Sequence, residues 1–138
     1  MAWLYTIPLP GVLLIIYNVL LFGGGDMGSR LAGEMFAVQL ISGANWSVSL
    51  AELLLGLGVV LLYVEMVKAT RTSAQSIVDH LFSLGVFVVY LIEFIVVAGC
   101  GNSTFLILGL MALLDVIAGF TISIVSARRD LAFQPPVG

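Results

Sequence analysis

Four long apolar stretches, separated by short segments rich in glycine, serine and charged residues, dominate the chain. They cover about residues 8–22, 48–67, 80–98 and 104–125. A helix that crosses a lipid bilayer needs roughly 20 consecutive apolar residues. The last three stretches reach about that length, whereas the first extends only about 22 Å at 1.5 Å per residue. The pattern predicts an all-α integral membrane protein, with a single transmembrane domain over residues 1–138 that is a four-transmembrane-helix bundle.

The start of the first stretch is open to two interpretations. Pro8 and Pro10 suit the opening turn of a helix, where a missing backbone N–H costs nothing. A helix that begins at Trp3 would instead run through these prolines with a kink. No positively charged region precedes the apolar run and no small-x-small cleavage site follows it, so we expect a retained helix rather than a signal peptide.

A weaker pattern lies between the first two stretches. Leu31, Met35 and Val38 share one face at helical spacing, which predicts a short amphipathic interfacial helix over residues 29–41. The alternative is a pore helix that dips into the membrane, with residues 42–46 as a filter-like turn. We favour the interfacial helix because such helices are much commoner than pore loops.

Composition supports a membrane protein. Hydrophobic residues make up 61% of the chain and charged residues 9%, against roughly 45–50% and 25% in ordinary globular domains. A net charge of −3 argues against a nucleic-acid partner. Cys100 is the only cysteine, which excludes an internal disulfide framework and a CxxC redox pair.

Basic residues predict the orientation. Lys68 and Arg71 precede the third stretch, and Arg128 and Arg129 follow the fourth, so these four lie on one side of a four-span topology. Only Arg30 lies opposite. The positive-inside rule then places both termini in the cytoplasm, and we expect a bacterial inner membrane.

Four carboxylates fall within the stretches, where a charge at the bilayer centre costs at least about 2.5–3.5 kcal/mol. Asp115 is the deepest, and Glu93 lies roughly 8 Å from the end of its stretch. Glu52 forms a predicted capping box with Ser49 in the "SLAE" sequence, which accounts for its position better than an ion-binding role does. Glu65 is expected to form a solvated ion pair with the lysine three residues later.

Small and polar side chains recur at intervals of three and four on one face of each stretch, as expected of helices that pack closely and share hydrogen bonds. The predicted packing positions are Ala112, Gly119, Ser123 and Gly56, and the predicted polar, candidate ion-binding positions are Asp115, Glu93, Tyr90, Asn18 and Glu52.

The third and fourth stretches should form a hairpin with its apex near residues 101–102. In straight antiparallel helices Asp115 and Glu93 would then be offset by roughly 7–8 Å along the axis. A direct bond between them is not expected, and Tyr90 or Asn18 is the expected partner of Asp115, with Glu93 reached through a water.

Other chemistry is sparse. His80, the only histidine, stands beside Asp79 at a predicted boundary, where a solvated side chain is more plausible than a metal ligand. The chain has no glycine-rich phosphate loop, no nucleophile elbow and no HExxH motif. We therefore expect no catalytic residues, no metal and no cofactor.

Two functions fit these observations. The first is a non-enzymatic accessory or assembly subunit of a membrane complex, or a homo-oligomer packed through small and polar helix faces. Its partners would be the lipid bilayer and other membrane subunits. The alternative is a proton- or cation-translocating oligomeric channel or transporter that uses Asp115 and Glu93. An enzyme is the least favoured function, because carboxylates are the only candidate catalytic groups that the sequence provides.

Overall fold

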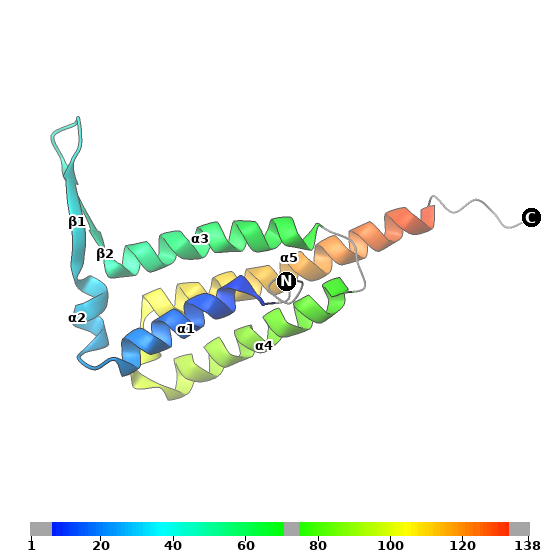
Figure 1. Ribbon diagram of the computed structural model, residues 1–138, viewed down its shortest axis with the longest axis horizontal. Helices are drawn as coiled ribbons and strands as arrows, with labels where there is room; N and C mark the ends of the chain where they lie inside the picture. The colour runs from blue at the N-terminus through cyan, green and yellow to red at the C-terminus, as the bar shows by residue number, and fades with distance from the viewer. Residues whose placement is uncertain (1–6, 71–74, 133–138) are drawn as a thin grey trace, which may run out of the picture.

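The computed structural model describes residues 7–70 and 75–132, which form a mostly helical bundle with a β-hairpin at one end (Figure 1). In chain order the elements are α1 (Leu9–Phe22), α2 (Met27–Ala32), β1 (Glu34–Gln39), β2 (Asn45–Ser49), α3 (Leu50–Ala69), α4 (Gln75–Val96), the 3-10 turn η2 (Ala98–Cys100) and α5 (Ser103–Ala132).

The four longer helices run side by side. α5 packs against both α3 and α4, and α1 lies between these two and contacts all three (Figure 1). We call the end of the bundle that carries α2, the β-hairpin and η2 the hairpin end. The opposite end, where α1 begins and α3 ends, is the tail end.

Within the described part of the chain, three helices are long and apolar enough to cross a membrane: α3 over its whole length, α4 over Val78–Val96 and α5 over Ser103–Arg128. α1 is apolar but has only 14 residues, about 21 Å. It starts directly after Pro8, with Pro10 in its first turn, as expected. The alternative start at Trp3 falls outside the described residues.

The segment between α1 and α3 differs from the prediction. The helix expected over residues 29–41 is wrong beyond Ala32, because Gly33 has extended ψ and the chain continues into an antiparallel hairpin of β1 and β2. Gly43 turns the hairpin with φ of +84°, a conformation that favours glycine. The pore helix is wrong for the same reason, since residues 42–46 form the hairpin tip and the start of β2.

Side chains cap the helix ends at the hairpin end. The Asp26 carboxylate accepts a hydrogen bond from the Ser29 amide at 2.8 Å and starts α2. The Arg30 guanidinium donates to the Leu20 carbonyl, and to the Gly24 carbonyl at 2.8 Å. The last turn of α1 therefore ends on a cation, which suits the negative end of the helix dipole.

The capping box predicted for α3 is confirmed. The Ser49 hydroxyl accepts a hydrogen bond from the Glu52 amide at 3.3 Å, and the Glu52 carboxylate accepts one from the Ser49 amide at 2.7 Å. Because both donors would otherwise lack a partner at the helix start, this pair accounts for Glu52 without any ligand.

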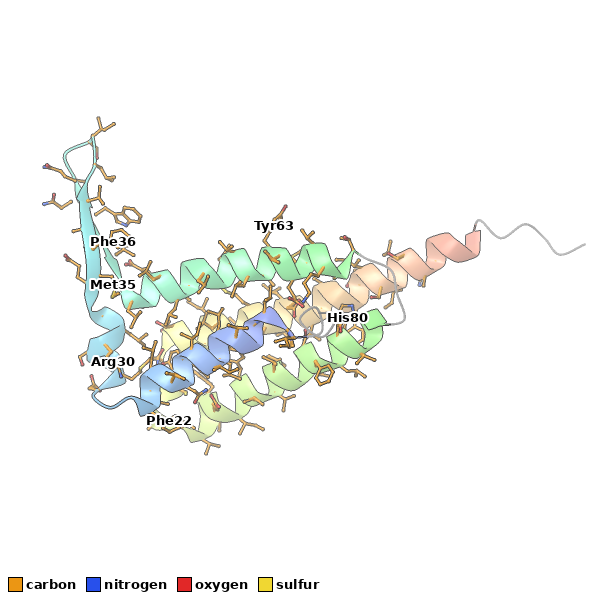
Figure 2. The ribbon with its side chains drawn as sticks, viewed as in Figure 1. Phe22, Arg30, Met35, Phe36, Tyr63 and His80 are labelled. Carbon is orange, nitrogen blue, oxygen red and sulfur yellow. The ribbon has the colours of Figure 1, made fainter. Side chains whose placement is uncertain are left out.

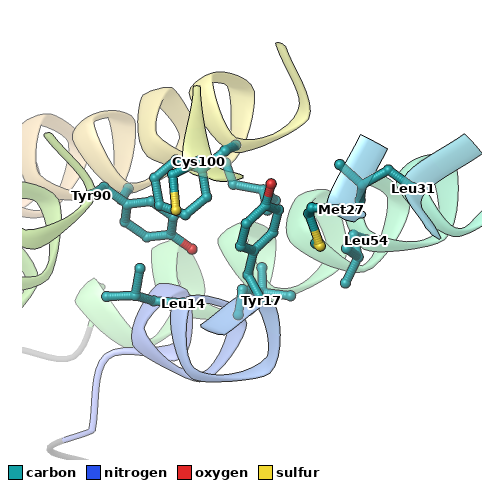
Figure 3. Packing of buried hydrophobic residues seen from close by; sticks show 11 residues of the cluster. Leu14, Tyr17, Met27, Leu31, Leu54, Tyr90 and Cys100 are labelled. Atoms are coloured by element: carbon teal, nitrogen blue, oxygen red, sulfur yellow. The ribbon is translucent and has the colours of Figure 1, made fainter. Parts of the chain in front are cut away.

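Buried apolar side chains fill the half of the bundle near the hairpin end (Figure 3). Phe105 of α5 lies between two tyrosines, with ring centroids 4.6 Å from Tyr17 and 5.0 Å from Tyr90. Asn102 holds the start of α5 by accepting from the Phe105 amide at 3.0 Å, and it donates to the Tyr17 hydroxyl at 2.6 Å. The hairpin-end half is therefore a tightly packed core, and the buried charged groups lie elsewhere.

Candidate functional site

Asp115 lies inside the tail-end half of the bundle and is only 2% exposed. The Ser83 hydroxyl of α4 donates a hydrogen bond to its carboxylate. The other oxygen, Oδ2, has no partner among the described residues, although buried polar atoms are nearly always paired. Asp115 therefore has one oxygen free to accept a proton, a water or another donor.

His80 is buried near Asp115, although the sequence predicted a solvated side chain. It is 5% exposed, and its Nε2 lies 3.0 Å from the Ser123 hydroxyl. Its ring packs directly over Gly119 and lies 5.5 Å from the Phe120 ring. Figure 2 marks its position near the tail end of α4. The absence of a side chain at Gly119 makes this burial sterically feasible.

Glu65 is also buried, at 7% exposure, so the expectation of a solvated pair is wrong. Lys68 Nζ lies 3.0 and 3.1 Å from its two carboxylate oxygens, and the Leu9 amide donates to Oε2 at 3.3 Å. The Leu9 amide is the first N–H of α1, a donor that has no partner within the helix. The carboxylate thus holds the start of the short helix α1 against α3.

These groups together form the tail-end polar cluster, contributed by α3, α4 and α5: Glu65, Lys68, His80, Ser83, Asp115 and Ser123. It contains two carboxylates, one lysine and one histidine. Across residues 7–70 and 78–128, no three histidine, cysteine or acidic side chains gather in a way that could hold a metal ion. What the cluster offers is a buried carboxylate with a free oxygen beside groups that bind protons.

Glu93 belongs to a separate site at the hairpin end. The Asn18 amide donates to its Oε2 at 2.8 Å and also to the Leu14 carbonyl at 3.0 Å. Both side chains are half-buried and line an open groove between α1 and α4, whose other lining residues are Leu14, Ile15, Val19 and Phe22. Along α4, Glu93 lies ten residues from the Ser83 that contacts Asp115, or roughly 15 Å.

The partners expected for Asp115 are therefore wrong. Asn18 binds Glu93, and Tyr90, only 1% exposed, donates to the Pro10 carbonyl at 3.1 Å. Tyr90 and the buried residues Leu108 and Ala112 lie between the level of Asp115 and that of Glu93. An apolar layer thus separates the two carboxylates within the chain.

The register of α4 against α5 explains the difference. Three contacts define it: Tyr90 with Gly109, Ser83 with Asp115, and His80 with Gly119. They centre the turn on η2, Ala98–Cys100, slightly earlier than the expected apex at residues 101–102. Asp115 consequently faces Ser83, which lies two helical turns before Tyr90 on α4.

The predicted packing positions divide into two groups. Ala112, Gly119 and Ser123 face the inside of the bundle, as expected. Gly56 does not, because a Cβ there would have no atom within 4 Å.

The close approach on α3 occurs at Gly58 instead, where a Cβ would lie 2.7 Å from Met111 Sδ. Figure 2 shows Tyr63, which is 68% exposed, on the outer side of α3. Gly56 and Glu52 are exposed as well and share this side at helical spacing. A stretch that is apolar all round gave no signal of which glycine would face inward.

Glu65 and His80 are the buried residues of the tail-end polar cluster that the sequence placed at a solvated boundary, whereas Ser83 lies on the polar packing face expected of its stretch. Comparison with known protein families, with curated proteins and with solved structures finds no match for the chain.

Proposed function

We propose that the protein is a non-enzymatic membrane subunit that assembles, with a second copy of itself or with another membrane protein, through the open groove between α1 and α4. The observation that carries this proposal is the Asn18–Glu93 pair, which is half-buried and opens onto the outside of the bundle.

The distribution of side chains suits a bilayer. Large apolar residues lie on the outside of the long helices, for example Val60 at 58% and Ile95 at 73% exposure, while Asp115 and Glu65 are inside. This arrangement is the reverse of that in a water-soluble bundle. With Lys68 and Arg128 near the tail end and Arg30 near the hairpin end, the tail end would face the cytoplasm of a bacterial inner membrane.

The groove has the properties of a helix-binding surface. An ionisable group that reaches the outside of a membrane helix is costly unless a partner covers it. Polar side chains such as Asn18 hydrogen-bond across helix contacts and hold membrane helices together. Ile15 and Val19, which are 64% and 67% exposed, supply the apolar rim against which a second helix would pack.

A photo-activated cross-linking residue at position 15 tests the proposal in native membranes. We expect it to give adducts with protein, either a second copy or another chain. The same residue at position 60, on the outer side of α3, should react with lipid only. Ile15→Trp should abolish the assembly detected by cross-linking at Val19, whereas Val60→Trp should not.

Both substituted residues are exposed and β-branched, so neither change disturbs the core of one copy. Lipid adducts alone from both positions 15 and 60 would contradict assembly through the groove. Protein adducts from position 60 and not from position 15 would place the interface on α3, which would also contradict assembly through the groove.

Ion translocation is a second candidate, favoured by the unpartnered Oδ2 of buried Asp115. A carboxylate that binds and releases a proton needs such a free position. The apolar layer at Tyr90 argues against a route from Asp115 to Glu93 inside one copy, so a route would require the assembled form.

Proteoliposome flux distinguishes this candidate. We expect Asp115→Asn and Glu93→Gln to abolish flux while the number of copies in the assembly stays the same. Glu93→Gln retains an oxygen that can accept from Asn18, which makes it a conservative change. Flux that survives both substitutions, or no flux from the unmodified protein under a proton or cation gradient, would eliminate translocation through these carboxylates.

A further inference from the structure

The β1–β2 hairpin has one apolar face and one polar face. Its register pairs Phe36 with Val48 and Val38 with Trp46. Because pairs alternate between the two faces of a hairpin, these four apolar residues share one face. The rings of Phe36 and Trp46 meet edge to face, with centroids 6.4 Å apart. The other face carries Ala37, Gln39, Asn45 and Ser47.

The apolar face is turned towards the helices. Val48, at the base of the hairpin where β2 leads into α3, is only 4% exposed and so faces the body of the protein. Trp46 and Val38 continue the same face beyond the edge of the bundle and are 52% and 47% exposed. Figure 2 shows Phe36 on the side of the hairpin from which α3 extends. No described element covers this face past Val48.

The hairpin runs crosswise to the helices and projects past α3, on the side of the bundle away from α4 (Figure 1). If the long helices run along the membrane normal, the hairpin lies parallel to the membrane surface, above the lipid beside α3. Its apolar face then continues the exposed outer side of α3, where Leu53 and Leu57 are 37% and 41% exposed. The two apolar surfaces meet at an angle, and the exposed carboxylate of Glu52, held by its capping bonds to Ser49, lies near their junction.

We propose that this hairpin is a lipid-binding platform whose apolar face rests in the interfacial layer of the outer leaflet. Tryptophan prefers that layer because its ring is apolar and its N–H is polar. Residues 34–49 contain no lysine or arginine, so the contact is with the glycerol and upper acyl region and needs no anionic headgroup. An isolated two-stranded hairpin is marginally stable in water, and a covered apolar face supplies the missing burial.

The occupant is lipid, because the hairpin lies crosswise to the long helices at the level where α3 begins, and its apolar face carries the half-exposed Trp46 beside the lipid-facing side of that helix. This inference rests on the membrane location given in the proposed function and not on the assembly. Membrane insertion and hairpin contact therefore need separate reporters in one experiment.

Tryptophan quenching by brominated phosphatidylcholine in proteoliposomes provides them. The chain has two tryptophans, so Trp3→Phe leaves Trp46 as the only one. We expect bromine near the glycerol to remove most of the Trp46 emission, and bromine deep in the acyl chain to remove little. Ser47→Trp, in a chain with Trp3→Phe and Trp46→Phe, reports the opposite face of the same strand and should be quenched by aqueous iodide instead.

Val60→Trp in the same tryptophan-free chain reports membrane insertion of α3. If Val60→Trp is quenched by lipid and Trp46 is not, the platform is overturned while the membrane location stands. If Trp46 resists both lipid and iodide, a protein surface covers it, and the platform is equally overturned. If Val60→Trp is not quenched, the membrane location itself fails.

Discussion

The imidazole ring of His80 lies over Gly119, in the space that a Cβ atom at that position would fill. This contact joins α4 to α5 at the level of the tail-end polar cluster and brings Nε2 within 3.0 Å of the Ser123 hydroxyl. A larger residue at position 119 would overlap the imidazole, so either the ring or one of the two helices would have to shift.

Gly119→Ala should therefore destabilise the bundle by about 1–3 kcal/mol, the usual cost of overpacking. The change can be measured by thermal unfolding in detergent, followed by circular dichroism. Gly85 on α4 is the matched control, since a Cβ there would meet no atom within 4 Å. Gly85→Ala should leave stability unchanged or raise it by up to about 1 kcal/mol. Equal effects from the two substitutions would contradict the His80–Gly119 contact.

Tyr90→Phe should lower the free energy of unfolding by about 1 kcal/mol, because it removes the buried hydrogen bond to the Pro10 carbonyl without creating a cavity. Tyr63→Phe should have no effect on the stability of one copy, since Tyr63 is 68% exposed. Chemical denaturation of both variants in the same detergent checks this pair. A larger loss of unfolding free energy in Tyr63→Phe than in Tyr90→Phe would contradict the stabilising hydrogen bond assigned to Tyr90.

Asn102→Ala should cost about 1–2 kcal/mol through loss of the cap that starts α5. The Asn102 amide also donates to the Tyr17 hydroxyl and to the Gly99 carbonyl, so one side chain ties α5 to α1 and η2. Asn102→Asp keeps the acceptor for the Phe105 amide but loses both donors, and should fall between wild type and alanine. Asn45→Ala, on the exposed hairpin, should change the unfolding temperature little.

Burial raises the pKa of the Cys100 thiol from 9.0 to about 11. The folded protein therefore keeps this proton where the unfolded chain would lose it. The contribution of Cys100 to stability is complete below pH 9 and declines as pH rises towards 11. The difference in unfolding free energy between wild type and Cys100→Ala should narrow over that interval.

Alkylation gives a second measurement of the same thiol. Cys100 is fully buried, so N-ethylmaleimide should modify it slowly at neutral pH in the folded protein and quickly after denaturation. Fast modification in the folded state would contradict both the burial of Cys100 and its raised pKa.

Several features followed from the sequence because they depend on local physical chemistry. An uninterrupted apolar stretch of sufficient length predicts a long helix, and α3, α4 and α5 are such helices. The proline-led start of α1 and the Ser49–Glu52 capping box depend on groups within one helical turn, so both could be predicted without knowledge of distant contacts.

Other features could not be predicted from the sequence, because they depend on contacts between segments that lie far apart along the chain. Leu31, Met35 and Val38 fit a helical face, but Met35 and Val38 lie in a strand because Gly33 ends the helix and a paired strand supplies hydrogen bonds. Gly56 and Gly58 lie two residues apart in an apolar helix, and only contact with Met111 decided which of them faces inward.

The sequence by itself determined that the chain forms apolar helices and that Asp115 lies deep within one of them. Only the tertiary structure decided what surrounds this carboxylate. A turn centred on η2 sets the register that brings Ser83 to Asp115 and leaves Tyr90 to the Pro10 carbonyl. Each residue along an α-helix advances 1.5 Å and turns by about 100°, so a shift of one or two residues in that turn exchanges every partner across the two helices.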